Sequence, residues 1–274
     1  MSARRGRGGP PVMRCLNILL IGIAFSGTLF QLFGLPPVLR TFGIKAAWLL
    51  LPIMLLQPLH WGLIHEGIHA HLLTNRRANE FWARLLSVML GLPFDATRFG
   101  HLVHHRFSRH AYDRADVYDG RGSYPLAWLV YRIRLFGGVY FGELLSPLIA
   151  FMPPSLGLRI VEMAIPLVEP NDILVRRLFA SLVLNIPKRR RTRHSLAMTL
   201  ALYVASAYAY GAWWPVLLAT IYARGVWHSL ADNVPHHGVN LDRPARARNF
   251  SLPAVFHVLV MNHHLHLTHH LYPR

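Results

Sequence analysis

Long apolar blocks alternate along the chain with short segments that are rich in arginine. The first block, Leu16–Leu35, is 20 residues long and contains no charged side chain and no histidine. At 1.5 Å per residue, an α-helix of this length crosses a hydrocarbon core about 30 Å thick. The apolar region of a cleaved signal peptide is shorter, at roughly 7–15 residues, so we expect a retained first membrane span whose N-terminus is inside.

A second apolar block, Ala46–Ile64, contains no Asp, Glu, Lys or Arg, and its pattern continues without a break into residues 65–71. A helix over residues 46–71 would be about 39 Å long. Because that length exceeds the thickness of the hydrocarbon core, we expect its end to protrude from the cytosolic face and to carry the first histidines with it.

A third block, Ser195–Ala223, has 29 residues without a charge or a histidine. It accommodates either one tilted span or two spans, Thr192–Ala212 and Trp214–Asp232, with a tight break at Gly211–Pro215. Paired tryptophans suit the membrane–water interface, and proline suits the first turn of a new helix, so both features fit the two-span alternative.

The block Tyr124–Met152 is interrupted by Arg132, Arg134 and Glu143. Charges in the middle of a bilayer are costly, so we expect an interfacial or re-entrant helix pair here instead of a crossing. This arrangement leaves the basic run Lys188–Arg193 in the cytoplasm, where such runs are typically found. The pattern therefore predicts four crossings, with both termini and every histidine cluster on the cytosolic side.

The composition agrees with an integral membrane protein. Hydrophobic residues make up 53% of the 274 residues and charged residues 15%, whereas an average soluble domain contains about 25% charged residues. The formal charge is +17, and the arginines flank the apolar blocks, as in loops that face anionic lipid headgroups. A nucleic-acid-binding domain would instead carry basic stripes on a soluble fold, so we expect no nucleic-acid partner.

We therefore expect an all-α integral membrane fold with about four transmembrane helices, interfacial helices and a cytosolic, histidine-rich cap. Residues 1–274 are expected to form a single domain, in which residues 1–14 are a disordered basic N-terminus. The single cysteine, Cys15, excludes an intramolecular disulfide and any metal cage built from cysteines.

Histidine is the most informative residue, with 18 copies in the chain. Three sets have the spacing i, i+3 or i, i+4 that places side chains on one face of a helix. They are His65-x3-His69, His101-x2-His104-His105 and His266-x2-His269-His270. Neutral imidazole binds iron, zinc, copper and nickel, and these eight histidines exceed the four ligands of one tetrahedral zinc. The three sets therefore predict a site for two metal ions.

Other histidines give weaker signals. Asn233 and His237 form an i, i+4 pair at the end of the last apolar block, but Pro235 disfavours a regular helix between them. Isolated histidines on apolar faces are usually hydrogen-bonded residues of the core. We apply that interpretation to His60, His194 and His257.

Carboxylates near the histidines are candidates to orient metal-bound rings through the second ring nitrogen. For Asp113–Asp119 we instead expect a solvated acidic loop. Asp232 follows His228 by four residues, and a carboxylate at the edge of the membrane is costly unless it is paired. A role for Asp232 beside the metal site is therefore as well supported as a purely structural one.

A competing motif overlaps the first histidine set. His65-Glu66-Gly67-Ile68-His69 matches H-E-x-x-H, which on a helix binds zinc and uses the glutamate as the general base of a metalloprotease. A membrane zinc metalloprotease would need a further ligand, for which Asp232 is a candidate, but it would leave the other two histidine sets without a task. A membrane protein that binds metal without catalysis is a third alternative.

The order and spacing of the three sets resemble the histidine boxes of the membrane fatty acid desaturase–hydroxylase superfamily, H-x(3–4)-H, H-x(2–3)-H-H and (H/Q)-x(2–3)-H-H. The ending Asn262–Pro273 is similar to the third box of that family with its following Leu-x-Pro. Asn233…His237 is similar to an Asn-x3-His element of acyl-CoA desaturases. The resemblance covers roughly residues 60–273.

The resemblance implies a non-haem di-iron enzyme that oxidises an unactivated C–H bond of a lipid, with O2 as co-substrate. Fatty-acyl desaturation is the expected reaction, and hydroxylation or ketolation of a carotenoid or another lipid is the alternative. Electrons are expected from a separate donor of the ferredoxin or cytochrome b5 type. The implied ligands of the two iron ions are His65, His69, His101, His104, His105, Asn233, His237, His266, His269 and His270.

Extra histidines beside the boxes leave two of these assignments open, between His236 and His237 and between His264 and His266. Because the substrate is apolar, we expect the site at the cytosolic membrane surface. Residues 81–94 and 124–152 are expected to line the substrate tunnel.

Overall fold

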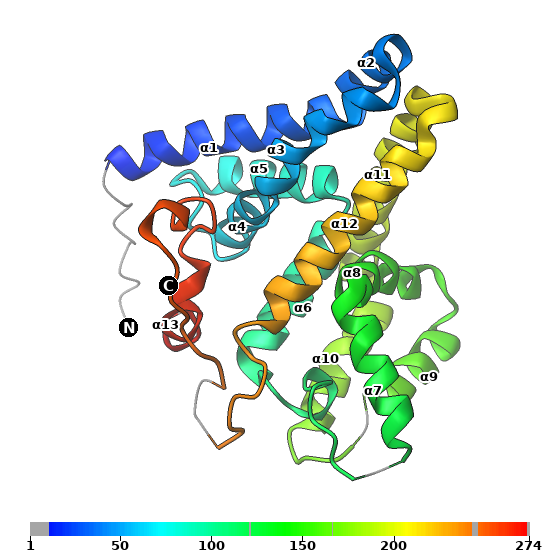
Figure 1. Ribbon diagram of the computed structural model, residues 1–274. Helices are drawn as coiled ribbons and strands as arrows, with labels where there is room; N and C mark the ends of the chain where they lie inside the picture. The colour runs from blue at the N-terminus through cyan, green and yellow to red at the C-terminus, as the bar shows by residue number, and fades with distance from the viewer. Residues whose placement is uncertain (1–10, 121, 166, 243–245, 273–274) are drawn as a thin grey trace.

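The computed structural model describes residues 11–120, 122–165, 167–242 and 246–272, and every regular element in these ranges is helical (Figure 1). The expected all-α fold is therefore confirmed for this part of the chain. The expected disordered N-terminus lies outside the described residues as far as residue 10, and helix α1 (Pro11–Leu29) already includes residues 11–14.

The first helical hairpin turns at Gly43. Helix α1 continues through the π-helical turn η1 (Phe30–Gly34) into α2 (Leu35–Phe42). Gly43 has a φ of 67°, a left-handed conformation that glycine adopts without the clash of a Cβ atom. The chain then returns through η2 (Gly43–Leu49), α3 (Leu50–Leu55) and α4 (Gln57–Ile68).

The second hairpin turns at Gly211, which has a φ of 55°. Its two limbs are α11 (Ile186–Tyr210) and α12 (Trp214–Asn233), joined by the short turn η6 (Gly211–Trp213). Pro215 lies in the first turn of α12, where a missing N–H leaves no hydrogen bond unmade. The two-helix alternative for this block is therefore confirmed as a helical hairpin.

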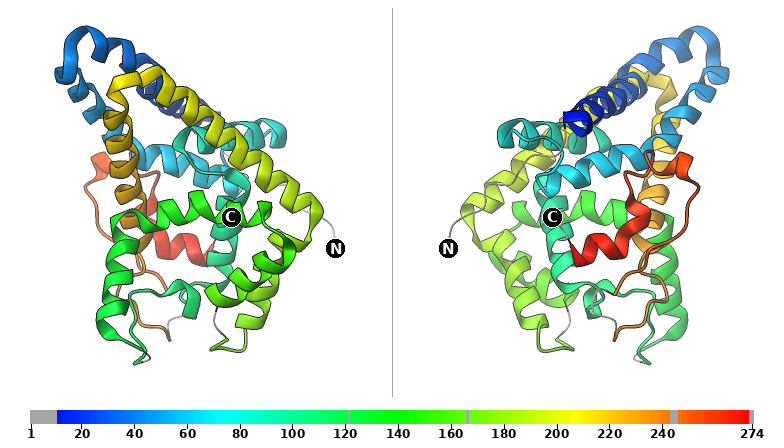
Figure 2. Two further views of the ribbon diagram at one scale, coloured as in Figure 1. Left: turned by 90° about the vertical axis from the view of Figure 1, so that its right-hand side faces the viewer. Right: turned by 90° about the vertical axis from the view of Figure 1, so that its left-hand side faces the viewer.

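The tips of the two hairpins pack together, at the end of the molecule away from the C-terminal helix α13 (His266–Leu271) (Figures 1 and 2). Leu32, Leu35 and Leu39 of the first hairpin form one buried cluster with Tyr210 and Leu217 of the second. The Tyr210 hydroxyl donates to the carbonyl of Gln31 at 2.6 Å, which ties the second tip to the π-helical turn of the first.

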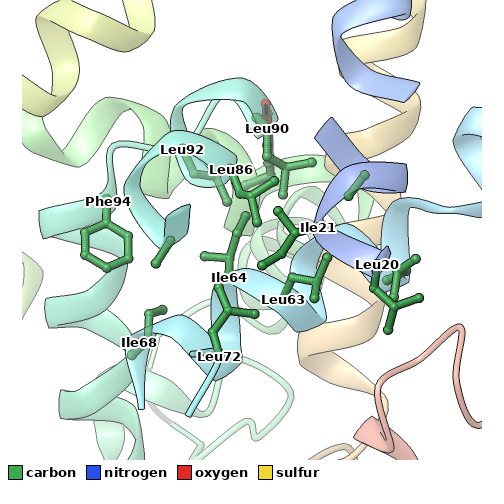
Figure 3. Packing of buried hydrophobic residues seen from close by; sticks show 14 residues of the cluster. Leu20, Ile21, Leu63, Ile64, Ile68, Leu72, Leu86, Leu90, Leu92 and Phe94 are labelled. Atoms are coloured by element: carbon green, nitrogen blue, oxygen red, sulfur yellow. Dashed lines mark hydrogen bonds between the residues drawn. The ribbon is translucent and has the colours of Figure 1, made fainter. Parts of the chain in front are cut away.

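Helices α1, α4 and α5 (Arg76–Leu90) enclose the largest apolar cluster (Figure 3). Figure 3 shows Ile64 near its centre, with Leu86 and Ile21 beside it. The side chain of Asn75 accepts hydrogen bonds from the first backbone N–H groups of α5. Gly91, in the left-handed conformation, ends that helix. This cluster supports α4, whose C-terminal end carries the first histidine set.

The remaining elements surround the other end of α11 and α12 (Figure 1). They are α6 (Phe94–Phe107), η3 (Ala111–Asp113), α7 (Tyr124–Ile133), η4 (Arg134–Gly138), α8 (Val139–Leu145), η5 (Ser146–Phe151), α9 (Pro154–Ala164), α10 (Asp172–Leu184), η7 (Ala254–Phe256), η8 (His263–Leu265) and α13 (His266–Leu271). Of these, α6 and α13 carry the second and third histidine sets.

Three helical stretches are long and apolar enough to cross a membrane: Cys15–Leu55, Tyr124–Phe151 and Ile186–Asn233. The first and the last contain the hairpin turns at Gly43 and Gly211. The middle stretch is bent, because Phe136 and Gly137 leave the helical conformation and separate α7 from α8. The expected helix pair in this segment is therefore present.

Candidate metal centre

The histidine sets lie on helix ends that converge on one region. His65 is in the last turn of α4, and His69 directly follows that helix. The second set belongs to α6 and the third to α13, which lie side by side in Figure 2. Spacings of three and four residues on these helices direct the rings of each set to one side.

Five imidazoles form a first group: His65, His69, His101, His105 and His269, whose nearest ring nitrogens all lie within 4.8 Å of one another. The Nε2 atoms of His69 and His101 are 3.0 Å apart, those of His101 and His105 are 2.9 Å apart, and those of His105 and His269 are 2.9 Å apart. All three sequence motifs therefore contribute to this group.

Four imidazoles form a second group: His104, His236, His266 and His270, within the same 4.8 Å limit. The Nε2 atom of His236 is 3.1 Å from that of His104 and 3.0 Å from that of His266. His266 Nε2 is in turn 3.0 Å from His270 Nε2. The two groups adjoin, because the rings of His105 and His270 lie 4.5 Å apart between centroids.

Hydrogen bonds between the rings cannot account for this packing. A neutral imidazole has one N–H donor and one acceptor nitrogen, so each Nε2 serves one such bond. His101 and His105 each place Nε2 within 3.0 Å of two other Nε2 atoms. His236 and His266 do the same in the second group, to within 3.1 Å. Lone pairs that converge in this way fit a cation at each group, and a donor set of imidazoles fits a transition metal.

Burial keeps most of these rings neutral, which is the form that binds metal. Burial, followed by the neighbouring imidazoles, lowers the pKa of His269 to about 3 and that of His105 to about 2. Burial and His104 likewise lower the pKa of His236 to about 4. For His104 burial also opposes protonation, but Asp113 outweighs it and raises the pKa.

Outer hydrogen bonds orient two rings of the second group. His104 Nδ1 lies 2.7 Å from Asp113 Oδ2, and His236 Nδ1 lies 2.9 Å from the carbonyl oxygen of Arg246. In both rings Nε2 is thereby directed at the group. Such outer partners typically fix the tautomer and orientation of a metal-bound histidine.

The expected solvated loop at Asp113–Asp119 is wrong for two of its carboxylates. Asp113 and Asp116 have side chains that are 12% and 6% exposed. Asp113 contacts His104 and accepts from the backbone N–H of Arg109 at 3.2 Å, and Asp116 forms an ion pair with the Arg109 guanidinium. Buried histidine and arginine partners, which a local charge pattern does not reveal, draw these carboxylates inward.

His237 belongs to neither group, and the amide oxygen of Asn233 has a hydrogen-bond partner outside both. The Tyr131 hydroxyl donates to Asn233 Oδ1 at 3.2 Å and lies 2.9 Å from His237 Nδ1, and the His237 side chain is half exposed. The second group contains His236 instead. Helix α12 ends at Asn233, and a tight turn follows in which the His236 N–H donates to the Asn233 carbonyl. The turn replaces the helical register on which the expectation for His237 depended.

The isolated histidines differ from one another. His60 is buried, with its ring nitrogens 3.0 Å from Thr28 Oγ1 and 2.9 Å from the Leu86 carbonyl oxygen, as expected for a core residue. His257 Nε2 lies 3.0 Å from the carbonyl oxygen of Leu252. His194 is exposed on α11, so the core interpretation is wrong there.

A cavity of about 680 Å³ adjoins both groups, because His101, His104 and His266 are part of its wall. Its apolar wall is formed by η5, α9 and α10 and includes Leu148, Ile149, Ile160, Val161, Phe179 and Leu182. Of the two segments expected to line the substrate tunnel, residues 124–152 contribute to this cavity from Arg134 onwards. The described wall contains no residue of 81–94, and the contributions of α9 and α10 were not predicted.

His263 is a residue that the spacing arguments missed. It lines the cavity, and its ring centroid lies 4.5 Å from that of His266 and 6.0 Å from that of His65. It therefore contacts one member of each group. The crowding of histidines before the third box was the only sequence signal for it.

The arrangement does not favour the protease alternative. Glu66 Oε1 lies 3.8 Å from His65 Nδ1. Asp232, the candidate third ligand, is held 3.2 Å from the Arg134 guanidinium and is absent from the first group. Imidazoles of all three sets take part in the two groups, whereas the protease motif uses only His65 and His69 of them.

Comparison with known families agrees with the geometry. A family model described as fatty acid desaturase matches residues 41–274. No curated protein and no solved structure matches the chain. The match includes all three histidine boxes and the segment that contributes His236. The chain therefore belongs to the fatty acid desaturase family.

Proposed function

We propose that the protein oxidises an unactivated C–H bond of a lipid with O2 at a di-iron centre, and that the reaction is fatty-acyl desaturation. The observation that carries the proposal is the convergence of nine imidazoles, from three boxes and one further segment, into two adjoining groups beside an apolar cavity. Membership in the fatty acid desaturase family supports the same reaction class.

We propose one iron ion for each histidine group, with His236 in place of His237 and without Asn233 as a direct ligand. The donor set suits this metal because neutral imidazole binds iron. When bound, the iron pair supplies the activation of O2 and the removal of hydrogen from carbon. The chain itself keeps the rings neutral through burial and orients two of them through Asp113 and the Arg246 carbonyl.

The cavity wall positions the substrate. Apolar side chains of η5, α9 and α10 bind an alkyl chain by removing its surface from water. When the alkyl chain is fixed, one of its carbon atoms lies beside the histidine groups. The position of that carbon decides which C–H bond is oxidised, because C–H oxidation depends on placement to within a fraction of an ångström. Exclusion of water by the same wall protects the reacting carbon from side reactions.

We further propose that the histidine groups face the cytoplasm and that a separate ferredoxin or cytochrome b5 type protein supplies electrons there. The two hairpin tips lie at one end of the molecule, away from α13, which carries the third histidine set (Figure 1). The basic run Lys188–Arg193 begins α11, at the end opposite to the Gly211 turn. Basic segments of this kind are typically cytoplasmic.

Metal analysis of the purified protein tests the centre. We expect two iron ions per chain, and we expect His270→Ala to lower the iron content and abolish substrate oxidation. His194→Ala is the matched control, because His194 is exposed and outside both groups. One zinc per chain, with activity retained in His270→Ala, would contradict the proposal and support a protease.

Lipid analysis of cells with and without the gene tests the reaction. Desaturation removes two hydrogen atoms from the substrate, whereas hydroxylation adds one oxygen atom to it, so mass spectrometry separates the two products. We expect the dehydrogenated lipid. A hydroxylated or ketolated lipid or carotenoid would assign the alternative reaction at the same centre.

A further inference from the structure

The opening of the main cavity is marked by the residues that line the cavity and are also exposed. They are Gly142 and Leu145 of α8, Ser146 and Leu148 of η5, and Ala164 of α9. The other described residues of the wall are buried or half-buried. The opening therefore lies between the α8–η5 segment and α9.

None of these exposed residues carries a charge. The charged residues of the described wall are Asp113, Arg134, Glu143 and Asp232, and all four are half-buried. The Arg134 guanidinium is already paired, at 3.2 Å from Asp232 Oδ2 and 3.7 Å from Asp113 Oδ1. Phosphate groups are bound in proteins by arginine and lysine. The described wall therefore offers no unpaired cation to the phosphate groups of a water-soluble acyl carrier.

The surface at the opening is apolar. Leu145 and Leu148 are 55% and 41% exposed, and Met163, next to Ala164, is 76% exposed. The α8–η5 side belongs to the Tyr124–Phe151 stretch, which has the length and composition of a membrane span, yet only 22% of its most apolar part is buried inside the protein. Exposed apolar patches usually mark a contact with lipid or with a partner, and the hydropathy of this stretch favours lipid.

Two arginines of α11 hold the end of η5. The Nε atoms of Arg189 and Arg193 both donate to the Ala150 carbonyl, at 2.6 and 2.7 Å, and the Arg193 guanidinium lies 5.3 Å from the centroid of the Phe151 ring. Both arginines belong to the basic run Lys188–Arg193, which we propose to be cytoplasmic. The opening, which directly precedes this end of η5, is therefore close to the cytoplasmic leaflet.

We infer that the cavity opens sideways into the hydrocarbon of the cytoplasmic leaflet, and that a lipid of the bilayer inserts its alkyl chain there. This inference rests on the proposed function and narrows its substrate class to lipids that reside in the membrane. The alkyl chain passes from hydrocarbon to the apolar wall of η5, α9 and α10, so its apolar surface is not exposed to water on the way.

Spin labels test which medium the opening faces. Cys15→Ser removes the only cysteine, and Leu145→Cys then carries a nitroxide in vesicles of phosphatidylcholine and phosphatidylglycerol. Electron paramagnetic resonance compares collisions with O2, which concentrates in hydrocarbon, and with chromium oxalate, which stays in water. We expect position 145 to favour O2, like Ile23→Cys in the apolar helix α1 and unlike Asn240→Cys at an exposed polar position. A label at position 145 that favours chromium oxalate would overturn the inference.

Gly142 allows the opening to be narrowed without a clash. It is exposed, and a Cβ atom at this position meets no atom within 4 Å. Gly142→Trp therefore places a large ring beside the opening. Gly22→Trp is the matched control, because Gly22 is an exposed glycine of α1 with the same free space.

Photolabelling reports whether a chain from the bilayer reaches the cavity. The vesicles contain hexadecane that bears a diazirine group, and mass spectrometry locates the adducts. We expect adducts on Val161 and Phe179 of the cavity wall in the wild type and in Gly22→Trp, and their loss in Gly142→Trp. Octanoyl-coenzyme A with the same diazirine, added in the water phase, should not label these two residues.

Three results would each overturn the inference: adducts that persist in Gly142→Trp, adducts from octanoyl-coenzyme A, or none from the alkane in the wild type. Iron analysis of the same preparations distinguishes this from failure of the proposed function. Two irons without entry of the alkane would reject the sideways opening alone. Entry of the alkane into a protein without iron would reject the di-iron reaction and leave the opening standing.

Discussion

His236 and His237 are adjacent in the chain, yet they have opposite environments. His236 is buried among His104, His266 and His270, whereas His237 is half exposed beside Tyr131. We expect His236→Ala to remove a ligand and to lower the iron affinity of the second group at least tenfold. His237→Ala should leave iron content unchanged. Equilibrium dialysis with iron measures both, and equal losses in the two variants would reject the assignment of His236.

Asp113 orients the ring of His104 through a hydrogen bond, but it is not a member of either histidine group. Burial alone would raise the pKa of Asp113, but His104 and Arg134 outweigh it and lower the pKa, so the carboxylate is ionised at neutral pH. Loss of such an outer partner typically weakens metal binding 10–100-fold. We expect this loss for Asp113→Ala, measured as iron retained against a chelator. Asp242→Ala, at an exposed position, is the control, and an identical loss in both variants would contradict the role.

The pKa of Asp113 also sets a pH dependence for its interaction with His104. Since the folded pKa lies below the ordinary value, this interaction stabilises the folded protein above the unfolded pKa of about 3.9. The stabilisation is lost as the pH falls through the lower, folded pKa. In metal-free protein, acid unfolding of Asp113→Ala should therefore show a weaker dependence on pH below about 4 than the wild type, measured by circular dichroism.

The sequence predicted eight of the nine grouped histidines, because their spacing on helices brings rings to one face. It did not distinguish His236 from His237, because one turn after Asn233 decides which ring points inward. It also missed the partners of Asp113, since Arg134 lies on another element and approaches only in the folded chain. Local spacing predicts shared faces, whereas contacts between distant segments depend on how the helices pack.

At the scale of elements, Arg224 joins four helical segments. Its guanidinium donates to the Leu90 carbonyl at 2.9 Å and to Gln31 Oε1 at 2.8 Å, and it contacts the Tyr203 hydroxyl. Arg224 is 1% exposed, and these three hydrogen-bond partners are all neutral. The carbonyl end of α5, which carries the partial negative charge of the helix dipole, compensates the buried cation in part.

We expect Arg224→Met to lower the free energy of unfolding by about 1–3 kcal/mol for each acceptor left without a partner. Thermal unfolding in detergent measures this, and Arg177→Met on the exposed face of α10 is the control. Because Arg224 is outside the histidine groups, the iron content of folded Arg224→Met should equal that of the wild type. A variant as stable as the wild type would show that the hydrogen bonds of Arg224 and the dipole of α5 contribute little to the free energy of unfolding.

The second hairpin was predictable from the break at Gly211–Pro215, and the bend between α7 and α8 from the charges that interrupt that block. The first two apolar blocks predicted two helices but did not locate the turn at Gly43. The apolar wall from α9 and α10 was not predictable, because neither helix carries a motif and their role arises only from packing beside η5. Residues whose chemistry is visible in one short segment can be assigned from sequence. A cavity whose wall combines segments from Trp61 to His266 cannot.

For the whole molecule, we expect the two hairpin turns to lie on one side of the membrane and the basic start of α11 on the other. We propose that Gly43 and Gly211 lie outside and that Arg190 lies in the cytoplasm with the histidine groups. Cys15 is the only cysteine and is exposed, so Cys15→Ser gives a background for single introduced cysteines. In intact cells, a membrane-impermeant maleimide should label cysteine at position 211 and should label cysteine at position 190 only after permeabilisation.

Position 240 supplies an independent check, because Asn240 is exposed and follows the segment that contributes His236. A cysteine there should behave like position 190 if the second histidine group faces the cytoplasm. Labelling of position 190 or 240 in intact cells would reject the four-crossing topology. If positions 190 and 240 were both accessible from outside while the first histidine set remained in the cytoplasm, the bent Tyr124–Phe151 stretch, which has the length and composition of a span, would have to cross the membrane.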